Sequence, residues 1–416
     1  MNEGLMNSLE QLRDAEQALL QIFSGIDATV KQNLTRVLNS FRDYSVGSHH
    51  FAGVTGYGHD DIGRETLDKV FATVMGAEKA AVRVQFVSGT HAIACALFGV
   101  LRPGDEMLAV AGAPYDTLEE VIGLRGSSQG SLIEFGITYR QLDLTSEGTI
   151  DWSALSQGIK QNTRLVLIQR SCGYSWRPSL SVEEIGKIVT IVKQQNPNTV
   201  CFVDNCYGEF IETQEPTHVG ADLMAGSLIK NPGGTIVTAG GYVVGRADLV
   251  EMAACRLTAP GIGSEGGATF DQLRLLFQGL FLAPQMVGEA MKGTHLTGYV
   301  FDRLGYPVNP APMAPRRDVI QAIKLGSAKK LIAFCKAIQQ NSPIGSYLDP
   351  IPDQMPGYES QVVMAGGTFI EGSTLEFSAD GPLREPYIVY CQGGTHWTHI
   401  SIALEAAIEA VGPSHL

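Results

Sequence analysis

Short β-rich runs alternate with helical stretches between residues 51 and 290, and this alternation constrains the fold more than any other feature of the sequence. Two parallel strands need a crossover connection between them, and that connection is usually a helix. The rhythm therefore predicts an α/β fold with a mostly parallel sheet and helices on both of its faces. The expected strands lie near residues 81–87, 106–111, 131–135, 164–169, 199–203, 223–229 and 236–245.

The two ends of the chain are expected to form separate units. Residues 5–46 carry apolar side chains at helical spacing, which predicts two amphipathic helices in an N-terminal helical arm over 1–50. Such an arm needs a surface to lie on, which suggests an oligomer. Glycine, proline and asparagine interrupt the pattern around 291–310, which indicates a domain boundary. We therefore expect a large domain over 51–290 and a smaller C-terminal α/β domain over 291–416.

The smaller domain has its own pattern of elements. A helix is expected near 325–339 and a closing helix near 397–411. Strand-like runs lie at 361–364, 368–371 and 387–391.

The composition narrows the class of protein. With 44% hydrophobic residues among 416, the chain can bury a sizeable core. Its 30 basic and 43 acidic residues give a net charge of −13, which repels nucleic-acid backbones and anionic membranes. No apolar run approaches the roughly 18 residues that a membrane helix needs, and the first residues lack a signal-peptide pattern. Seven cysteines without a C-x-x-C pair argue against a disulfide framework or a zinc ribbon. We expect a cytoplasmic protein without metal, nucleic-acid or membrane partners.

Two charged residues are expected to meet at one edge of the large sheet. The run VCFVDNCYGEF is an apolar strand that ends in Asp204, and GADLMAGSLIKNPGG brings a second strand to Lys230. The carboxyl ends of parallel strands form the ligand-binding edge of such sheets. The desolvation cost of burying both charges favours a functional reason for them, and a structural ion pair is the alternative.

A third element favours a cofactor. Ser88, Gly89 and Thr90 lie between a strand and a helix of small and apolar residues, so backbone N–H groups and two hydroxyls gather at a helix N-terminus. This arrangement binds phosphate, and it is equally a good N-cap. A phosphate site together with Asp204 and Lys230 suits pyridoxal phosphate, which a lysine holds as a Schiff base while an aspartate faces its pyridinium nitrogen.

These motifs resemble those of the fold type I pyridoxal-phosphate enzymes, the aspartate aminotransferase fold, and among them the Cys/Met-metabolism lyases such as cystathionine and methionine γ-lyases. The lysine motif of that group is G-A-D, four residues, then S-x-T-K; here it is GAD (220–222) and SLIK (227–230), with Ile229 in place of the threonine. The aspartate motif D-N-T-F is DNCY (204–207) here. The segments GYGHDDIGR, QRSCGYSWRPSL, SLIKNPGG and FQGLFLAP are similar to a bacterial branch known as methionine γ-lyase-like or aluminium-resistance proteins.

The resemblance implies catalytic roles for four residues. Lys230 would bind the cofactor and then move the Cα proton of the substrate, and Asp204 would keep the pyridine nitrogen protonated. Tyr115 would stack on the cofactor ring and protonate a departing thiolate. Tyr207 would hydrogen-bond the phenolic oxygen of the cofactor. For both tyrosines, a buried structural aromatic is the alternative.

The resemblance also implies how the phosphate is held. The expected phosphate ligands are Ser88, Gly89, Thr90 and Ser227. A second clamp in the family, the motif Y-x-R, reaches across the dimer to the neighbouring phosphate. Its counterpart is Tyr57-Gly58-His59, in which histidine replaces arginine, and Arg64 is the residue that could substitute.

The substrate carboxylate needs an arginine, because a guanidinium binds a carboxylate with two parallel hydrogen bonds. In the family this arginine comes from the C-terminal domain, so Arg384 in DGPLREPYIVY is the first candidate. Arg170 in LIQRSCGY is the second. For each, a structural or surface arginine is the alternative.

The expected function is that of a pyridoxal-phosphate-dependent carbon–sulfur lyase that acts on an amino acid of the cystathionine or methionine type. It would work by β- or γ-elimination, as a homodimer or homotetramer with the active site at the subunit interface. Two alternatives stay open. One is another fold type I reaction, such as a threonine-type aldolase or an aminotransferase, and the other is a pyridoxal-phosphate-binding protein with little turnover.

Overall fold

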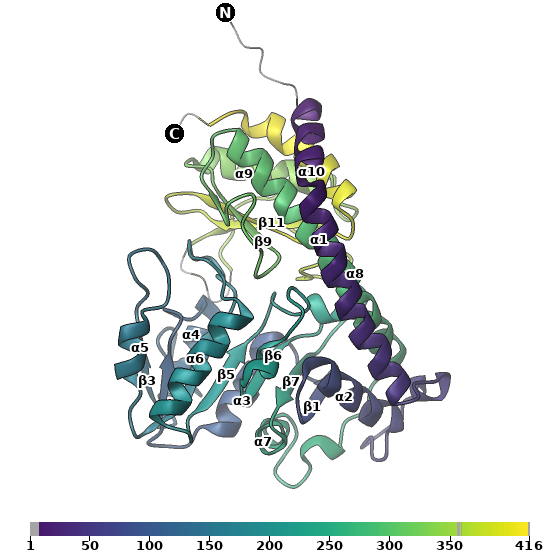
Figure 1. The fold of residues 1–416 in the computed structure, drawn as a ribbon, viewed down its shortest axis with the longest axis vertical. Coiled ribbons are helices and arrows are strands. Elements are labelled where there is room, and N and C mark those ends of the chain that lie inside the picture. The colour runs from purple at the N-terminus through teal and green to yellow at the C-terminus, as the bar shows by residue number, and fades with distance from the viewer. Residues whose placement is uncertain (1–7, 356–357, 359, 415–416) are drawn as a thin grey trace, which may run out of the picture.

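The computed structural model describes residues 8–355, 358 and 360–414, and seven strands form its larger sheet in the order β1-β7-β6-β5-β4-β2-β3 (Figure 1). The strands β3, β2, β4, β5 and β6 pair in parallel, whereas β7 runs antiparallel to both β6 and β1. The mostly parallel sheet that the sequence predicts is therefore confirmed. Its strands are β1 (Lys79–Arg83), β2 (Glu106–Ala109), β3 (Thr138–Gln141), β4 (Thr163–Gln169), β5 (Val200–Asp204), β6 (Leu223–Ser227) and β7 (Gly241–Gly245).

Alternate residues of one strand face opposite layers of helices. In β4, Leu165 and Leu167 pack with α3, α4 and α7, whereas Val166 and Ile168 pack in the core that includes α2, α5 and α6. Because both faces are covered, the strands have continuous apolar runs and not an apolar–polar alternation. The helices are α2 (Ile62–Met75), α3 (Gly89–Val100), α4 (Asp116–Ile122), α5 (Trp152–Gly158), α6 (Val182–Gln195) and α7 (Ala247–Leu257), with short 3-10 helices at Ser48–Phe51, Pro216–Val219, Asn231–Gly233 and Gly263–Glu265.

One strand lies later in the chain than predicted. Residues 131–135 form turns, and the strand is β3 instead. The backbone N–H groups of Leu132 and Ile133 bond to carbonyl groups at the end of α4, which ties this segment to the helix. The apolar character of the run therefore reflects burial beside α4 and not strand pairing.

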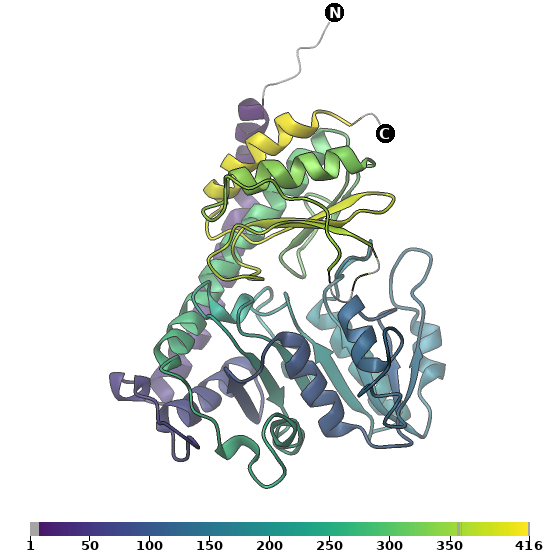
Figure 2. The same cartoon turned by 180° about the vertical axis from the view of Figure 1, so that it is seen from behind.

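A single long helix, α1 (Ser8–Asp43), occupies the region where two helices are predicted. Its buried residues, from Leu12 to Ser40, recur at spacings of three, four or seven, so one unbroken stripe faces α8 (Leu273–Arg303). Figures 1 and 2 show these two helices side by side along both sheets. Packing along the whole stripe keeps the helix continuous through its polar centre. In the described part of the chain, no helix is long and apolar enough to cross a membrane.

The second sheet has five antiparallel strands in the order β10-β11-β12-β9-β8. The helices α9 and α10 pack together over one of its faces, and the other face is turned toward the larger sheet (Figures 1 and 2). The predicted boundary after residue 290 falls within α8, which contacts strands of this sheet, so the proposed domain division stays a prediction. The elements are β8 (Val308–Asn309), β9 (Ile320–Lys324), α9 (Ala328–Gln340), β10 (Val362–Ala365), β11 (Ser378–Pro382), β12 (Ile388–Gln392) and α10 (Trp397–Val411).

One predicted strand of the smaller sheet is wrong, and three real strands, β8, β9 and β11, were not predicted. At 368–371 the backbone N–H groups of Phe369 and Ile370 bond to the carboxylate of Glu376, 2.8 and 2.9 Å away, and not to a neighbouring strand. The strand β11 has the sequence SADGP, which has low intrinsic β-propensity. It is a strand because β10 and β12 pair with it on either side.

Two adjacent leucines of α1 test how much the α1–α8 packing contributes to stability. Leu19 is fully buried, whereas Leu20 is 56% exposed. We expect Leu19→Ala to lower the free energy of unfolding by about 2–5 kcal/mol, because it removes buried methyl groups and leaves a cavity. Leu20→Ala is the matched control and should change stability much less. Urea unfolding followed by circular dichroism measures both, and equal effects would contradict the described packing.

Candidate active site

The carboxyl edge of the larger sheet carries a buried carboxylate. Asp204 is the last residue of β5, and its register partner on β6 is Ala225. One carboxylate oxygen accepts a hydrogen bond from the backbone N–H of Cys206 at 3.1 Å. Burial raises the pKa of Asp204, while this hydrogen bond and the charge of Lys230 lower it. The structure thus places Asp204 and Lys230 within electrostatic reach of each other, as the sequence predicts.

The amine of Lys230 lies at the same edge, three residues after the end of β6. Its Nζ is 3.9 Å from the ring centroid of Tyr207. Burial lowers the pKa of Lys230, but the acidic groups of Tyr207, Cys206 and Asp204 raise it by more, so the net pKa is above the ordinary value. The side chain is therefore an ammonium that must lose a proton before it can act as a nucleophile.

The N-terminus of α3 abuts the ends of β5 and β6. Ser88 is the N-cap residue, and its hydroxyl oxygen accepts a hydrogen bond from the backbone N–H of His91 at 3.1 Å. A Cβ atom on Gly89 would lie 3.1 Å from Cβ of Ser227 and 3.3 Å from Sγ of Cys206. Glycine therefore allows the helix to approach the strand ends closely, and it brings Ser88, Gly89 and Ser227 together. Ser88 can cap the helix while the turn binds a phosphate, because the first turn of α3 has further backbone N–H groups without a partner inside the helix.

Tyr115 reaches the same edge of the sheet from the loop after β2. Its hydroxyl is 2.9 Å from Oγ1 of Thr90, and its backbone N–H donates to Gln169 at 2.8 Å. Burial is the main cause that raises the pKa of Tyr115, and the charge of Asp204 adds to it. The contacts with Thr90 and Gln169 hold the phenol beside the α3 N-terminus, and burial favours its neutral form by raising its pKa.

Tyr207 has a strained backbone, with a φ of 72° that bulky residues rarely adopt. Its ring packs against a small apolar cluster that includes Cys172 and Tyr390, which links the two sheets. Such outliers concentrate at functional sites, where the surrounding structure holds them in place.

Arg170 is not free to bind a substrate, which corrects its prediction as a carboxylate ligand. The side chain is fully buried, and its guanidinium bonds to Asn205, to the carbonyl of Gly208 and to Glu212 at 2.8, 2.8 and 2.9 Å. A second carboxylate, that of Glu215, lies 3.8 Å away. The guanidinium is therefore used within the protein, and it supports the loop that follows Asp204.

Arg384 is the candidate that stays available. It is exposed, in the turn after β11, and has no ion pair among the described residues. Burial raises the pKa of Tyr390, and the charge of Arg384 lowers it in part, so this arginine lies near Tyr390, which belongs to the apolar cluster that Tyr207 packs against.

The structure does not bring Tyr57 to the other site residues of its own chain. Tyr57 is 84% exposed, and its ring packs on His59 with 5.8 Å between centroids. Arg64 cannot replace the missing arginine of this motif, because it is buried and bonds to the carbonyl groups of Gly58, Gly267 and Glu265.

One acidic residue near Lys230 was not predicted from the sequence. Asp380 lies in β11, only 7% exposed, and within hydrogen-bonding reach of the Tyr174 hydroxyl. Burial raises the pKa of Asp380 to about 6, while Tyr174 and the charge of Lys230 oppose the rise. An aspartate in the run SADGP was the available signal, but the strand that carries it was not predicted.

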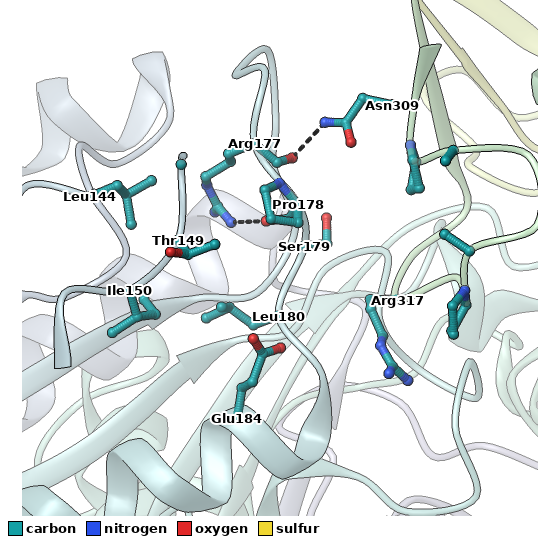
Figure 3. A pocket seen from close by; sticks show the side chains of 15 residues that line it. Leu144, Thr149, Ile150, Arg177, Pro178, Ser179, Leu180, Glu184, Asn309 and Arg317 are labelled. Atoms are coloured by element: carbon teal, nitrogen blue, oxygen red, sulfur yellow. Dashed lines mark hydrogen bonds between the residues drawn. The ribbon is translucent and has the colours of Figure 1, made fainter. Parts of the chain in front are cut away.

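A separate cavity of about 300 Å³ lies between the loop after β3, residues 177–184 and residues 309–317 (Figure 3). Its Arg177 side chain donates to the carbonyl groups of Pro178 and Ser171, and its Arg317 pairs with Glu212 at 3.0 Å. Both cations are engaged within the protein. None of the residues that meet at Lys230 lines this cavity.

The groups that converge at Lys230 fit pyridoxal phosphate. The cofactor needs an amine for its aldehyde, a carboxylate for its ring nitrogen and N–H donors for its phosphate. Lys230, Asp204 and the α3 N-terminus supply these at one edge of the sheet, and Gly89 lets the helix N-terminus approach Ser227 and Cys206 closely. Ile229, which replaces the hydroxyl residue of the motif, points elsewhere: its Cδ1 would lie 3.4 Å from a Cβ on Gly372.

Known proteins are similar to this chain over nearly its whole length. The family model described as methionine gamma-lyase matches residues 8–412. The uncharacterized protein YnbB of Bacillus subtilis (strain 168) is 49% identical over 399 residues, 96% of this chain and 95% of its own. A solved structure from Listeria innocua, provisionally named a cystathionine beta-lyase involved in aluminium resistance, is 48% identical, covers 98% of this chain and all of its own, and has a TM-score of 0.95. A carbon–sulfur lyase involved in aluminium resistance from Clostridium novyi NT is 46% identical, covers 96% and 95%, and has a TM-score of 0.92.

The structural roles assigned to Arg170 and Arg384 predict different effects of their substitution on stability. We expect Arg170→Gln to lower the free energy of unfolding by about 3–5 kcal/mol, because it removes the buried guanidinium that bonds to Asn205, Gly208 and Glu212 and leaves the buried Glu215 with only the cation of Arg36, 3.7 Å away, among the described residues. Arg384→Gln should stay within about 0.5 kcal/mol of the wild type, because its side chain is exposed. Denaturant unfolding measures both. If Arg170→Gln kept wild-type stability, the structural role assigned to Arg170 would be wrong.

Proposed function

Because the chain belongs to the methionine gamma-lyase family and has its fold type I architecture, we propose that it is a pyridoxal-phosphate-dependent enzyme that cleaves a carbon–sulfur bond of a sulfur amino acid by β- or γ-elimination. The observation that supports this most is the meeting of Lys230, Asp204 and the α3 N-terminus at the carboxyl edge of the larger sheet. The products would be a thiol, ammonia and a 2-oxo acid.

Lys230 and Asp204 have complementary roles in this proposal. When bound, the cofactor withdraws electrons from the substrate Cα. The Asp204 carboxylate keeps the ring nitrogen protonated, since an opposite charge at about 4 Å in an effective dielectric near 20 contributes about 4 kcal/mol. Lys230 holds the cofactor and, once the substrate amine has displaced it, takes the proton from Cα.

The phosphate and the leaving thiol are served by separate groups. The backbone N–H groups at Ser88 and Gly89, with the hydroxyls of Thr90 and Ser227, would bind the phosphate, and the positive end of α3 favours its charge. Tyr115 would pass its hydroxyl proton to the departing thiolate as the carbon–sulfur bond breaks. Arg384 would bind the substrate carboxylate from the small-sheet side.

A homo-oligomer, dimer or tetramer, completes this proposal. Several large apolar side chains are exposed beside the α3 N-terminus and on neighbouring loops: Tyr57 (84%), Val87 (84%), Phe270 (69%) and Phe369 (71%). Exposed apolar groups of this kind mark interaction surfaces. A second copy would cover them and would receive Tyr57 at its own phosphate site. The seven cysteines are all free thiols, which supports a cytoplasmic, reducing location.

Cofactor attachment and turnover test the function together. With pyridoxal phosphate added, the wild-type protein should turn yellow. Borohydride should then fix the cofactor on the peptide that contains Lys230, which peptide mass spectrometry would detect. Lys230→Ala should lose both the label and at least about 10²-fold of thiol release. Lys329→Ala, an exposed lysine on α9, is the control and should keep both.

A substrate panel separates the competing reactions. Cystathionine, methionine, cysteine and threonine are incubated with the loaded protein, and thiol and 2-oxo acid are followed separately. Thiol together with 2-oxo acid is the expected result. Acetaldehyde and glycine from threonine would indicate an aldolase instead, and a labelled Lys230 without any product would indicate a binding protein.

A further inference from the structure

Asp380 is a buried carboxylate without a cationic partner. No lysine or arginine of the described chain forms an ion pair with it, and the hydrogen bond from Gln392 is long, at 3.4 Å. A buried carboxylate is costly unless it is paired with a cation or well hydrogen-bonded. The hydrogen bond from the Tyr174 hydroxyl and the charge of Lys230 offset this cost only in part, since burial still raises the pKa of Asp380, so the carboxylate can accept a further cation.

Aromatic rings surround this carboxylate. Tyr390 is its register partner on β12, and the ring of Tyr174 packs on Tyr390 with 5.1 Å between centroids. The ring of Tyr358 also packs against the ring of Tyr174, with 5.6 Å between the two centroids. A carboxylate beside several aromatic faces is the typical environment for an ammonium group, which gains a charged hydrogen bond and cation–π contacts at once.

This group of residues borders Lys230. The Lys230 amine lies over the ring of Tyr207, and this ring packs in the same cluster as Tyr174 and Tyr390. The charges of Lys230 and Asp380 also act on each other. Asp204 approaches Lys230 from the larger sheet and Asp380 from the smaller one, so Asp380 is not needed for the cofactor nitrogen.

We propose that Asp380, with the rings of Tyr174, Tyr358 and Tyr390, is a specificity site for a second ammonium group that the substrate carries beyond its sulfur atom. This inference rests on the proposed carbon–sulfur lyase function and narrows its substrate class. Amino acids whose leaving thiol bears an amine, such as cystathionine, belong to the class, and methionine does not. In this proposal the substrate ammonium, and not Lys230 once it holds the cofactor, would balance the charge of Asp380.

Two isosteric ligands isolate the ammonium. S-(2-aminoethyl)-L-cysteine and S-propyl-L-cysteine differ only in whether the chain beyond sulfur ends in an ammonium or a methyl group. We expect the cofactor-loaded wild-type protein to bind the first roughly 10- to 100-fold more tightly, as measured by titration calorimetry. Asp380→Asn should abolish this preference and leave the affinity for S-propyl-L-cysteine unchanged. In thiol-release assays, Asp380→Asn should likewise remove the difference in KM between the two ligands and change kcat little.

The asparagine variant keeps the shape of Asp380 and one accepting oxygen for the Tyr174 hydroxyl or the Gln392 amide, so it should unfold close to the wild-type midpoint. Asp302→Asn, an exposed residue at the end of α8, is the matched control and should keep the full preference. The inference is overturned if wild-type protein binds both ligands equally, or if Asp380→Asn weakens both by the same factor.

The binding measurement also distinguishes this inference from the proposed function. If Lys230 takes up the cofactor and thiols are released but the ammonium gives no advantage, only the role of Asp380 fails. If Lys230 takes up no cofactor and neither ligand yields a thiol, the lyase proposal fails, and the same calorimetric comparison on the unloaded protein decides whether Asp380 binds ammonium.

Discussion

The buried guanidinium of Arg170 is the interaction on which the geometry of the site depends. It bonds to Asn205 and to the carbonyl of Gly208, and so it fixes the loop that begins at Asp204 and carries Tyr207. A Cβ atom on Gly208 would lie 2.5 Å from Cδ of Arg170, so only glycine permits this contact. The two carboxylates that pair with Arg170 offset the desolvation of its charge. The loop can therefore hold Tyr207 in a strained conformation beneath the Lys230 amine.

The two sheets contribute opposite sides of one site. Lys230 and Asp204 come from the ends of parallel strands, whereas Asp380 comes from an antiparallel strand more than 100 residues later in the chain. The helices α1 and α8 run along both sheets and pack against each other, so they hold the sheets in a common frame (Figure 1).

Prediction from the sequence succeeded where one local element places a residue. Lys230, Asp204 and Ser88 each lie at the end of a strand or the start of a helix, and such positions follow from apolar runs and their flanking residues. It failed where tertiary contacts override local preference. The apolar residues 131–135 form turns beside α4, SADGP becomes a strand between two others, and α1 stays one helix because α8 stabilises its whole length.

The sequence by itself determined that a lysine, an aspartate and a helix N-terminus would meet at one edge of a mostly parallel sheet, because the carboxyl ends of parallel strands lie on the same side. Only the tertiary structure decided which arginine is free. Arg170 and Arg384 both lie in polar segments, but one is enclosed by Glu212 and Glu215 and the other faces solvent. It also decided that Asp380 faces Lys230. Burial and charge pairing depend on segments distant in the chain, and no local pattern of residues encodes that distance.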